Sequence, residues 1–313
     1  MSTFSWMSAP DISSNAAFRR WAKGIFDAFV GCGWVQTEDS GQLQESDFAT
    51  LAVPTTTNGV AGYVIFRMND VHQSACPIFI KFEFGRGNSA SLNIPAIWIT
   101  VGQGSNGAGA ITGTLLARQQ NYTGSSASGA VTEYPSYASC HGGGICLAPW
   151  VGFVDTAAFF FAIERSCDES GAYTADAVAI VMACSGLLKV RVIGNGGSPA
   201  GVLVADGQFC NVSLPATING LDASTASTLS EDGVVAPVLP IPFMAPGVKP
   251  WVSNAMVAVH PGDAGSTSVI QAATINGQTR TYRAWTSFNQ RTGVIRLASS
   301  STNYVVPAII WES

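Results

Sequence analysis

The chain has few charged residues. Charged side chains make up 11% of its 313 residues and the net charge is -5, whereas an average soluble domain carries roughly 25% charged residues. No basic cluster is denser than Arg19, Arg20 and Lys23, which we interpret as the solvated side of a helix. Nucleic-acid binding needs a basic surface. The composition therefore argues against direct contact with nucleic acid and favours surfaces that are buried against other subunits.

Long apolar segments are also missing. The longest apolar runs lie around residues 157–163 and 177–184, well below the roughly 18 residues that a membrane-spanning helix needs. The N-terminus shows no basic region followed by an apolar stretch and a small-residue cleavage site. We therefore expect no membrane span, and we expect a chain that is made in a cytoplasm and then stays soluble or assembles.

Complete catalytic signatures are absent as well. Residues 102–107 match GxGxxG, but neither a helix pattern nor an acidic residue follows where a dinucleotide site needs them. Residues 141–144 read HGGG, like the oxyanion loop of esterases, but the chain contains no GxSxG serine motif. We therefore predict no catalytic residues, no cofactor-binding residues and no cofactor, and we expect that the protein is not an enzyme.

Three acidic pairs fall in polar turns, where solvated carboxylates are expected. Two carboxylates from distant loops can still converge as in glycosidases, so glycan hydrolysis stays open as an alternative. The pairs are Glu38-Asp39, Asp168-Glu169 and Glu231-Asp232.

The seven cysteines are an odd number in a chain too large to need a disulfide scaffold. Thiolate and imidazole are the ligands that zinc prefers, so Cys140, His141, Cys146 and Cys167 are candidates for a zinc site. Their spacing is not that of a recurrent zinc motif, and a local Cys140–Cys146 disulfide is an alternative. Most cysteines lie in apolar surroundings, so we predict buried thiols and no metal.

The clearest pattern is a run of strands. From Ile78 to Phe84, large apolar residues alternate with mixed ones at period two, which indicates a half-buried strand. Residues 63–68 and 96–101 are the expected neighbours of this strand. Further strands are predicted at 157–166, 177–184, 187–193 and in the C-terminal region, with tight hairpins at Ser185-Gly186 and Asn276-Gly277.

One helix is predicted near the N-terminus. Phe18, Trp21, Ile25 and Phe29 follow three- and four-residue spacing. One of residues 13–15 can cap the start, and glycines at 31 and 33 can end the helix. We expect its aromatic stripe to lie on a sheet.

These patterns predict a mainly β fold. It consists of antiparallel, sandwich-like sheets with one N-terminal amphipathic helix and a smaller C-terminal β unit. The predicted division is a helix-plus-sandwich domain at 1–200, a Gly/Ser/Pro-rich connector at 201–250 and a C-terminal β domain at 251–313. Prolines between 237 and 250 predict that the connector is extended and holds neither a regular helix nor a central strand.

Six segments of the chain carry a set of motifs that occur together in one group of proteins. They are FRRWAKGIFDAF (18–29), GWVQTEDSGQ (33–42), GYVIFRMND (62–70), PIFIKFEFG (77–85), WITVGQGSNGAG (98–109) and GQTRTY (277–282). They resemble a group of virion structural proteins from tailed bacteriophages, in which an initial helix leads into VQTxDTGQ-like and GYxIxRFND-like segments.

The resemblance implies a non-enzymatic structural role in the virion, in the tail or baseplate. Its implied partners are copies of the same chain and other virion proteins, after assembly in the bacterial cytoplasm. The alternatives are a capsid decoration protein and a receptor-binding or glycan-binding tail component. In that last case Trp150, Tyr134 and Tyr137 are candidates for stacking on a host surface glycan.

Overall fold

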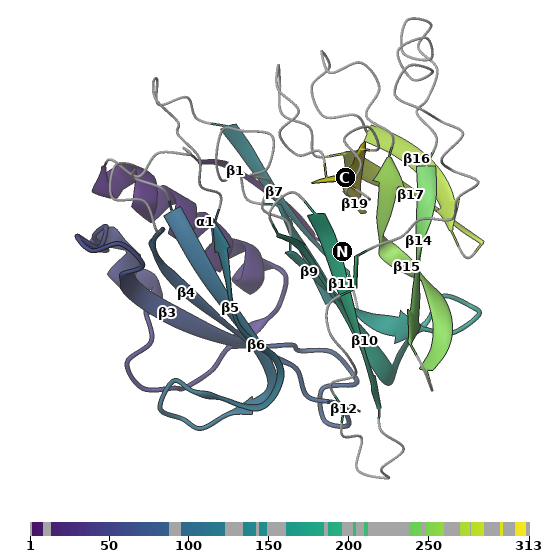
Figure 1. Cartoon of the computed structure of the whole chain (residues 1–313), viewed down its shortest axis with the longest axis horizontal. Coiled ribbons are helices and arrows are strands. Elements are labelled where there is room, and N and C mark those ends of the chain that lie inside the picture. The colour runs from purple at the N-terminus through teal and green to yellow at the C-terminus, as the bar shows by residue number, and fades with distance from the viewer. Residues whose placement is uncertain are drawn as a thin grey trace, which may run out of the picture.

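The computed structural model describes residues 2–8, 14–87, 95–122, 134–141, 144–148, 161–184, 187–195, 203–204, 210–211, 238–245, 248–259, 270–275, 277–284, 295–296 and 304–310. Within these residues the chain is mainly β, with two sheets of antiparallel strands and one α-helix near the N-terminus (Figure 1). The predicted fold class is therefore confirmed.

The smaller sheet has five antiparallel strands in the order β2-β3-β4-β5-β6. Three of them confirm the strands predicted at 63–68, 78–84 and 96–101. A short 3-10 helix, η1 (Glu45–Ala49), lies between β2 and β3. The strand bounds are β2 (Val35–Gln36), β3 (Val60–Arg67), β4 (Phe79–Arg86), β5 (Pro95–Ser105) and β6 (Ile111–Tyr122).

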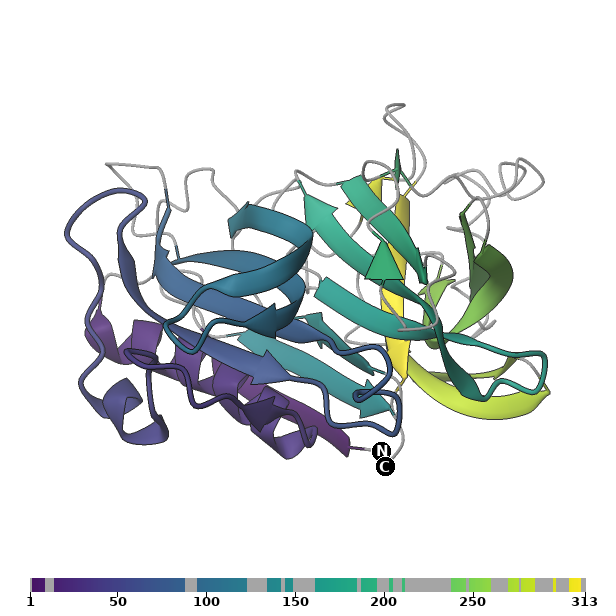
Figure 2. The same cartoon turned by 90° about the horizontal axis from the view of Figure 1, so that it is seen from below.

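Helix α1 (Asn15–Gly31) lies against the smaller sheet, as its aromatic stripe predicts. Its N-cap is Ser14, whose hydroxyl accepts a hydrogen bond from the Ala17 amide at 3.2 Å. Trp21 meets Phe84 edge-on, with ring centroids 5.8 Å apart. Figure 2 shows α1 running beneath the strands of the smaller sheet. The apolar stripe of the helix is thus buried against β4.

The larger sheet follows the order β1-β7-β8-β9-β10-β11-β18-β19-β15-β14, and four more strands branch from this path. Its ladders are antiparallel apart from a parallel contact between β11 and β18. The bounds are β1 (Ser2–Ser8), β7 (Tyr134–His141), β8 (Gly144–Ala148), β9 (Phe161–Cys167), β10 (Tyr173–Cys184), β11 (Leu187–Asn195), β12 (Leu203–Val204), β13 (Cys210–Asn211), β14 (Val238–Ala245), β15 (Val248–Val259), β16 (Ile270–Ile275), β17 (Gln278–Ala284), β18 (Ile295–Arg296) and β19 (Tyr304–Ile310).

One hydrophobic core joins the helix and both sheets. Phe82 of β4 is fully buried, and its ring centroid lies 4.9 Å from that of Phe29 on α1 and 5.9 Å from that of Phe161 on β9. Val178, Ile180 and other side chains of the larger sheet belong to the same cluster. The facing sheets with a shared core form the sandwich-like arrangement that the strand patterns predict.

Two strands were not among those predicted from the sequence. Residues 238–245 form strand β14 within the predicted connector, where the prolines predicted neither a regular helix nor a central strand. Strand β14 is an end strand of the sheet, where one side of the backbone needs no partner and Pro240 and Pro242 are tolerated. Strand β1 was not predicted at all.

The predicted hairpins are confirmed by register. Cys184 pairs with Leu187, which fixes a two-residue connection between β10 and β11. Ile275 pairs with Gln278, which leaves a two-residue connection between β16 and β17 at positions 276 and 277. The division at 1–200, 201–250 and 251–313 stays a prediction, although the β11–β18 contact shows that strands on both sides of the connector share a sheet.

Candidate functional site: buried polar contacts between the sheets

Strand β9 carries two charged residues that are completely buried. Glu164 and Arg165 are adjacent in a strand whose seven residues are all buried, and both are 0% exposed. Successive residues of a strand point to opposite faces of its sheet. The two charges therefore serve two different neighbours, and burying them without partners would be costly.

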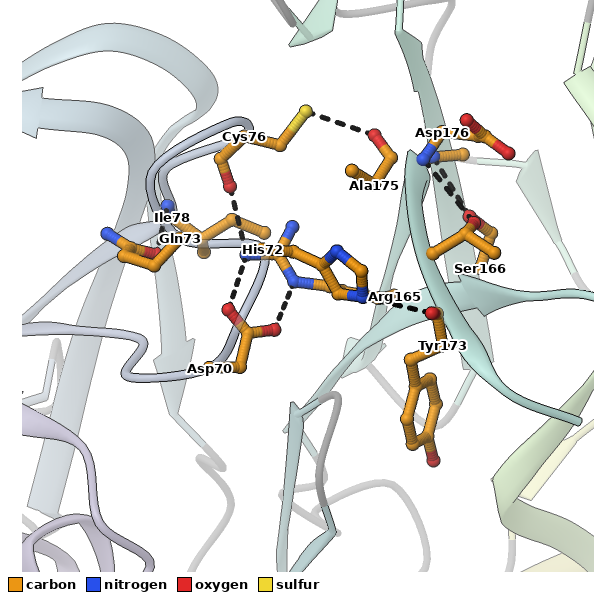
Figure 3. Close-up of polar contacts among 12 residues, drawn as sticks. Asp70, His72, Gln73, Cys76, Ile78, Arg165, Ser166, Tyr173, Ala175 and Asp176 are labelled. Carbon is orange, nitrogen blue, oxygen red and sulfur yellow. Dashed lines mark hydrogen bonds and ion pairs between the residues drawn. The ribbon is translucent and has the colours of Figure 1, made fainter.

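Arg165 faces the loop between β3 and β4. Its guanidinium forms a two-point ion pair with the Asp70 carboxylate, in which Nε donates to Oδ2 and Nη2 donates to Oδ1 at 3.1 Å. Nη2 also donates to the Cys76 carbonyl oxygen at 2.9 Å. Figure 3 shows Asp70 and Cys76 approaching Arg165 from the same loop. This contact ties the smaller sheet to the larger one.

Two further hydrogen bonds reinforce that junction. His72 Nε2 donates to the Tyr173 carbonyl oxygen at 2.9 Å, and the Cys76 thiol donates to the Ala175 carbonyl oxygen at 3.0 Å. Burial raises the pKa of Cys76, and nearby Arg165 offsets only part of that rise. Cys76 is therefore a neutral thiol that serves as a hydrogen-bond donor, and a thiolate nucleophile is disfavoured here.

Glu164 faces strand β15 in the opposite direction. Its carboxylate accepts hydrogen bonds from the Ser253 hydroxyl, from the Asn254 amide at 2.8 Å and from the Ala255 amide at 3.2 Å. Burial raises the pKa of Glu164 to about 7, and these donors offset part of the effect of burial. A carboxyl group with a pKa near neutrality can act as an acid or base, but its oxygens here are occupied by donors from β15. It holds two strands together.

The Glu164 pKa predicts a loss of stability as the pH rises. A raised carboxyl pKa means that the folded chain binds this proton more tightly than the unfolded chain, so the carboxyl contributes least stability above pH about 7. Between pH about 4.5 and pH about 7 the unfolding free energy should fall by about 3 kcal/mol from this group. Urea unfolding of the wild type and of Glu164→Gln at about pH 5 and about pH 8 measures this change in unfolding free energy. Between these pH values the variant should lose much less unfolding free energy than the wild type.

The matched control is Glu169→Gln, because Glu169 lies in an exposed turn. It should keep the pH dependence of the wild type. If the unfolding free energies of the wild type and Glu164→Gln depend equally on pH, Glu164 is not the group responsible for the loss of stability.

Asp39 forms a third buried polar cluster, at the hairpin end of β5 and β6. We expected a solvated carboxylate, but Asp39 is 4% exposed. It accepts hydrogen bonds from the Thr37 and Ser105 hydroxyls, both at 2.7 Å, and from the Gly109 amide at 2.9 Å. Burial raises the pKa of Asp39, but the donors from Ser105, Gly109 and Thr37 outweigh it and hold that pKa below its usual value. The prediction of a solvated turn was wrong because the β5–β6 hairpin folds back onto this turn.

The neighbouring segment adds to the same cluster. Gln42 accepts from the Ile65 amide at 3.0 Å, and the Tyr63 hydroxyl donates to the Ser40 carbonyl oxygen at 2.6 Å. The segments 33–42, 62–70 and 98–109, which are far apart in sequence, thus meet at Asp39. Their polar residues position loops of the smaller sheet.

The glycine motifs occupy strands and turns. Residues 102–107 lie at the end of β5 and in the turn before β6, so a strand follows them where a dinucleotide site needs a helix. His141 ends β7 and Gly144 begins β8, and the two intervening glycines lie outside the described residues. The described part of this motif is a β-hairpin.

The candidate zinc ligands are divided by the sheet register. In the β7–β8 ladder Cys140 is opposite Ile145 and Cys146 is opposite Ser139, so the two cysteine positions fall on opposite faces. This placement argues against the alternative of a Cys140–Cys146 disulfide. Cys167 is buried on β9, where burial raises its pKa. Among the described residues no three His, Cys, Asp or Glu side chains are grouped to hold a metal.

The remaining candidates are placed only in part. Asp168 and Glu169 lie in an exposed turn, as predicted, whereas Glu231-Asp232 and Trp150 lie outside the described residues. Tyr134 and Tyr137 belong to β7, but their side chains are also outside the description. None of the described helices is long and apolar enough to cross a membrane.

No protein-family model matches the chain, and comparison with curated proteins and with solved structures finds no significant similarity. The interpretation of these clusters therefore rests on their own geometry. In each one, a buried ionisable group forms hydrogen bonds or an ion pair with a segment distant in sequence. The adjacent charges at 164 and 165 were a signal that sequence reasoning missed, because a charged pair inside an apolar strand needs partners on both faces.

Proposed function

We propose that this protein is a non-enzymatic structural component of a tailed-bacteriophage particle, in the tail or baseplate. It acts through contacts with copies of itself and with other virion proteins, after assembly in the bacterial cytoplasm. Direct contact with nucleic acid is not part of this role.

The observation that carries the proposal is how the polar residues are used. Asp39, Asp70, Glu164 and Arg165 are all engaged in bonds that join separate segments of the fold. Catalysis requires a reactive group that substrate can reach, whereas these groups stabilise a fixed shape. A chain with 11% charged residues also offers surfaces that lose little solvation energy when another subunit covers them.

The segments that resemble phage virion proteins support the same proposal. Residues 33–42, 62–70 and 98–109 come together around Asp39, where their side chains fix loops. Such residues are needed to keep the fold of a building unit.

The test is to find the protein in intact particles. Particles of the phage that encodes this chain, purified on a density gradient, should contain it in multiple copies by quantitative mass spectrometry. Gold-labelled antibody should mark the tail or baseplate in electron micrographs. Absence from purified particles, or turnover of a host polysaccharide by the purified chain, would overturn the proposal, and labelling of the capsid surface would favour the decoration alternative.

A further inference from the structure

The end strands of the two sheets differ in how well they are protected against pairing with another chain. The main strand paths end at β2 and β6 in the smaller sheet and at β1 and β14 in the larger one. An end strand presents unpaired amide and carbonyl groups to which another chain can add, unless the edge is very short, bulged, charged or interrupted by proline.

Three of these four ends are protected. Strand β2 has only two residues. The β5–β6 ladder contains two register shifts, which place bulges along β6. Strand β14 contains Pro240 and Pro242, which lack an amide hydrogen, and its ladder with β15 also has two register shifts. Regular addition of another strand is thus discouraged at each of them.

Strand β1 is the exception among these four ends; β16, which pairs only with β17, is a further end on a branch of the larger sheet. Strand β1 pairs with β7 over seven consecutive residues without a register shift. Its sequence, STFSWMS, contains no charge, proline or glycine. Among the described residues, no strand other than β7 pairs with it. In the described part of the chain this edge is therefore regular, uncharged and available to another strand.

The edge is also held firmly in place. Phe4 and Trp6 pack on α1 at Gly31 and Gly24, where the helix has no side chain. A Cβ atom at Gly31 would lie 2.2 Å from Phe4 Cζ, and one at Gly24 would lie 2.3 Å from Trp6 Cδ1. Both rings remain only half-buried. The helix therefore fixes β1 against the core while part of each aromatic ring stays accessible.

The order of residues in β1 is complementary to itself. When the strand is placed antiparallel to a second copy with Ser5 at the centre, Phe4 lies opposite Trp6 of the partner subunit and Thr3 lies opposite Met7 of the partner subunit. Serines lie opposite each other at the two ends. Cross-strand aromatic pairs stabilise antiparallel ladders, and no like charges meet in this arrangement. A two-fold axis through Ser5 satisfies both copies equally.

We propose that β1 is a self-association surface, through which two copies pair antiparallel about Ser5 and join their larger sheets into one. This deepens the proposed function by naming one of its subunit contacts. The partner is a second copy because this register sets Phe4 opposite Trp6 twice and opposes no like charges.

Charge substitutions at Thr3 and Met7 test this pairing in the full-length chain. Thr3→Lys/Met7→Lys and Thr3→Glu/Met7→Glu each place like charges in both symmetric pairs. Each variant alone should associate at least about tenfold more weakly than the wild type in sedimentation experiments. Thr3→Lys/Met7→Glu places opposite charges in both pairs and should retain the dimer. An equimolar mixture of the Lys/Lys and Glu/Glu variants should also form dimers.

The matched control is Thr112→Lys/Thr114→Lys on β6, because both threonines are exposed on a protected edge. This control should associate like the wild type, and circular dichroism checks that every variant is folded. A wild-type monomer at all concentrations, or association that ignores the charges on β1, would overturn the β1 contact. Failure of the β1 contact does not affect the proposed function, which depends on whether purified particles contain the chain. Absence of the chain from particles would overturn the proposed function, but it would not change the sedimentation result for the dimer.

Discussion

Asp70→Ala is expected to destabilise the protein by about 3–5 kcal/mol, because it leaves a buried guanidinium without its counter-ion. Arg165 is 0% exposed, and its Nη1 already has no hydrogen-bond partner among the described residues. Only Asp70 supplies a carboxylate to it in the described structure. Urea unfolding followed by circular dichroism at neutral pH measures the loss.

Two further variants test whether the loss of stability comes from the unpaired buried charge of Arg165 or from the loss of any ion pair. Glu169→Ala removes one partner of the exposed Lys249–Glu169 pair and should have no measurable effect. Asp70→Leu combined with Arg165→Met removes both buried charges and should be less destabilised than Asp70→Ala alone. If Asp70→Ala is as stable as Glu169→Ala, the junction does not hold the sheets together as described.

Phe82→Ala is expected to cost about 3–5 kcal/mol, because it opens a cavity where three elements meet. Phe82 is fully buried and touches Phe29 of α1 and Phe161 of β9 in edge-on ring contacts. Its loss removes packing between the helix, the smaller sheet and the larger sheet at once. Guanidinium unfolding should show a lower midpoint and, because the sheets separate more easily, a broader transition.

The control for this substitution lies on the same strand. Phe79 points to the other face of β4, is only half-buried and is absent from the core cluster. Phe79→Ala should therefore destabilise clearly less than Phe82→Ala. Phe82→Leu should recover much of the stability, because it refills most of the cavity. Equal losses for Phe79→Ala and Phe82→Ala would show that the shared core is not where we place it.

The strands and the helix could be predicted because their signals are local. The alternation from Ile78 to Phe84 and the spacing of Phe18, Trp21, Ile25 and Phe29 each report which side of an element is apolar. The Asn276-Gly277 turn fixes its hairpin for the same reason. Strand β1 escaped prediction because its residues carry neither a clear alternation nor a turn signal, and it is ordered by pairing with β7 and packing on α1.

The polar clusters could not be predicted in the same way. Asp39 has the sequence context of a solvated turn, and only the return of the β5–β6 hairpin brings Ser105 and Gly109 onto its carboxylate. The partners of Arg165 and Glu164 lie about a hundred residues away along the chain.

The amino-acid sequence by itself determined the β class of the protein, the place of its helix and the low charge of its surface, since periodicity and composition are properties of neighbouring residues. Only the tertiary structure decided which carboxylates are buried, which cysteines share a face and which sheet edge stays open. Those properties depend on strand register and on segments that meet across the core, and the free energy of such contacts is not encoded in any one stretch of the chain.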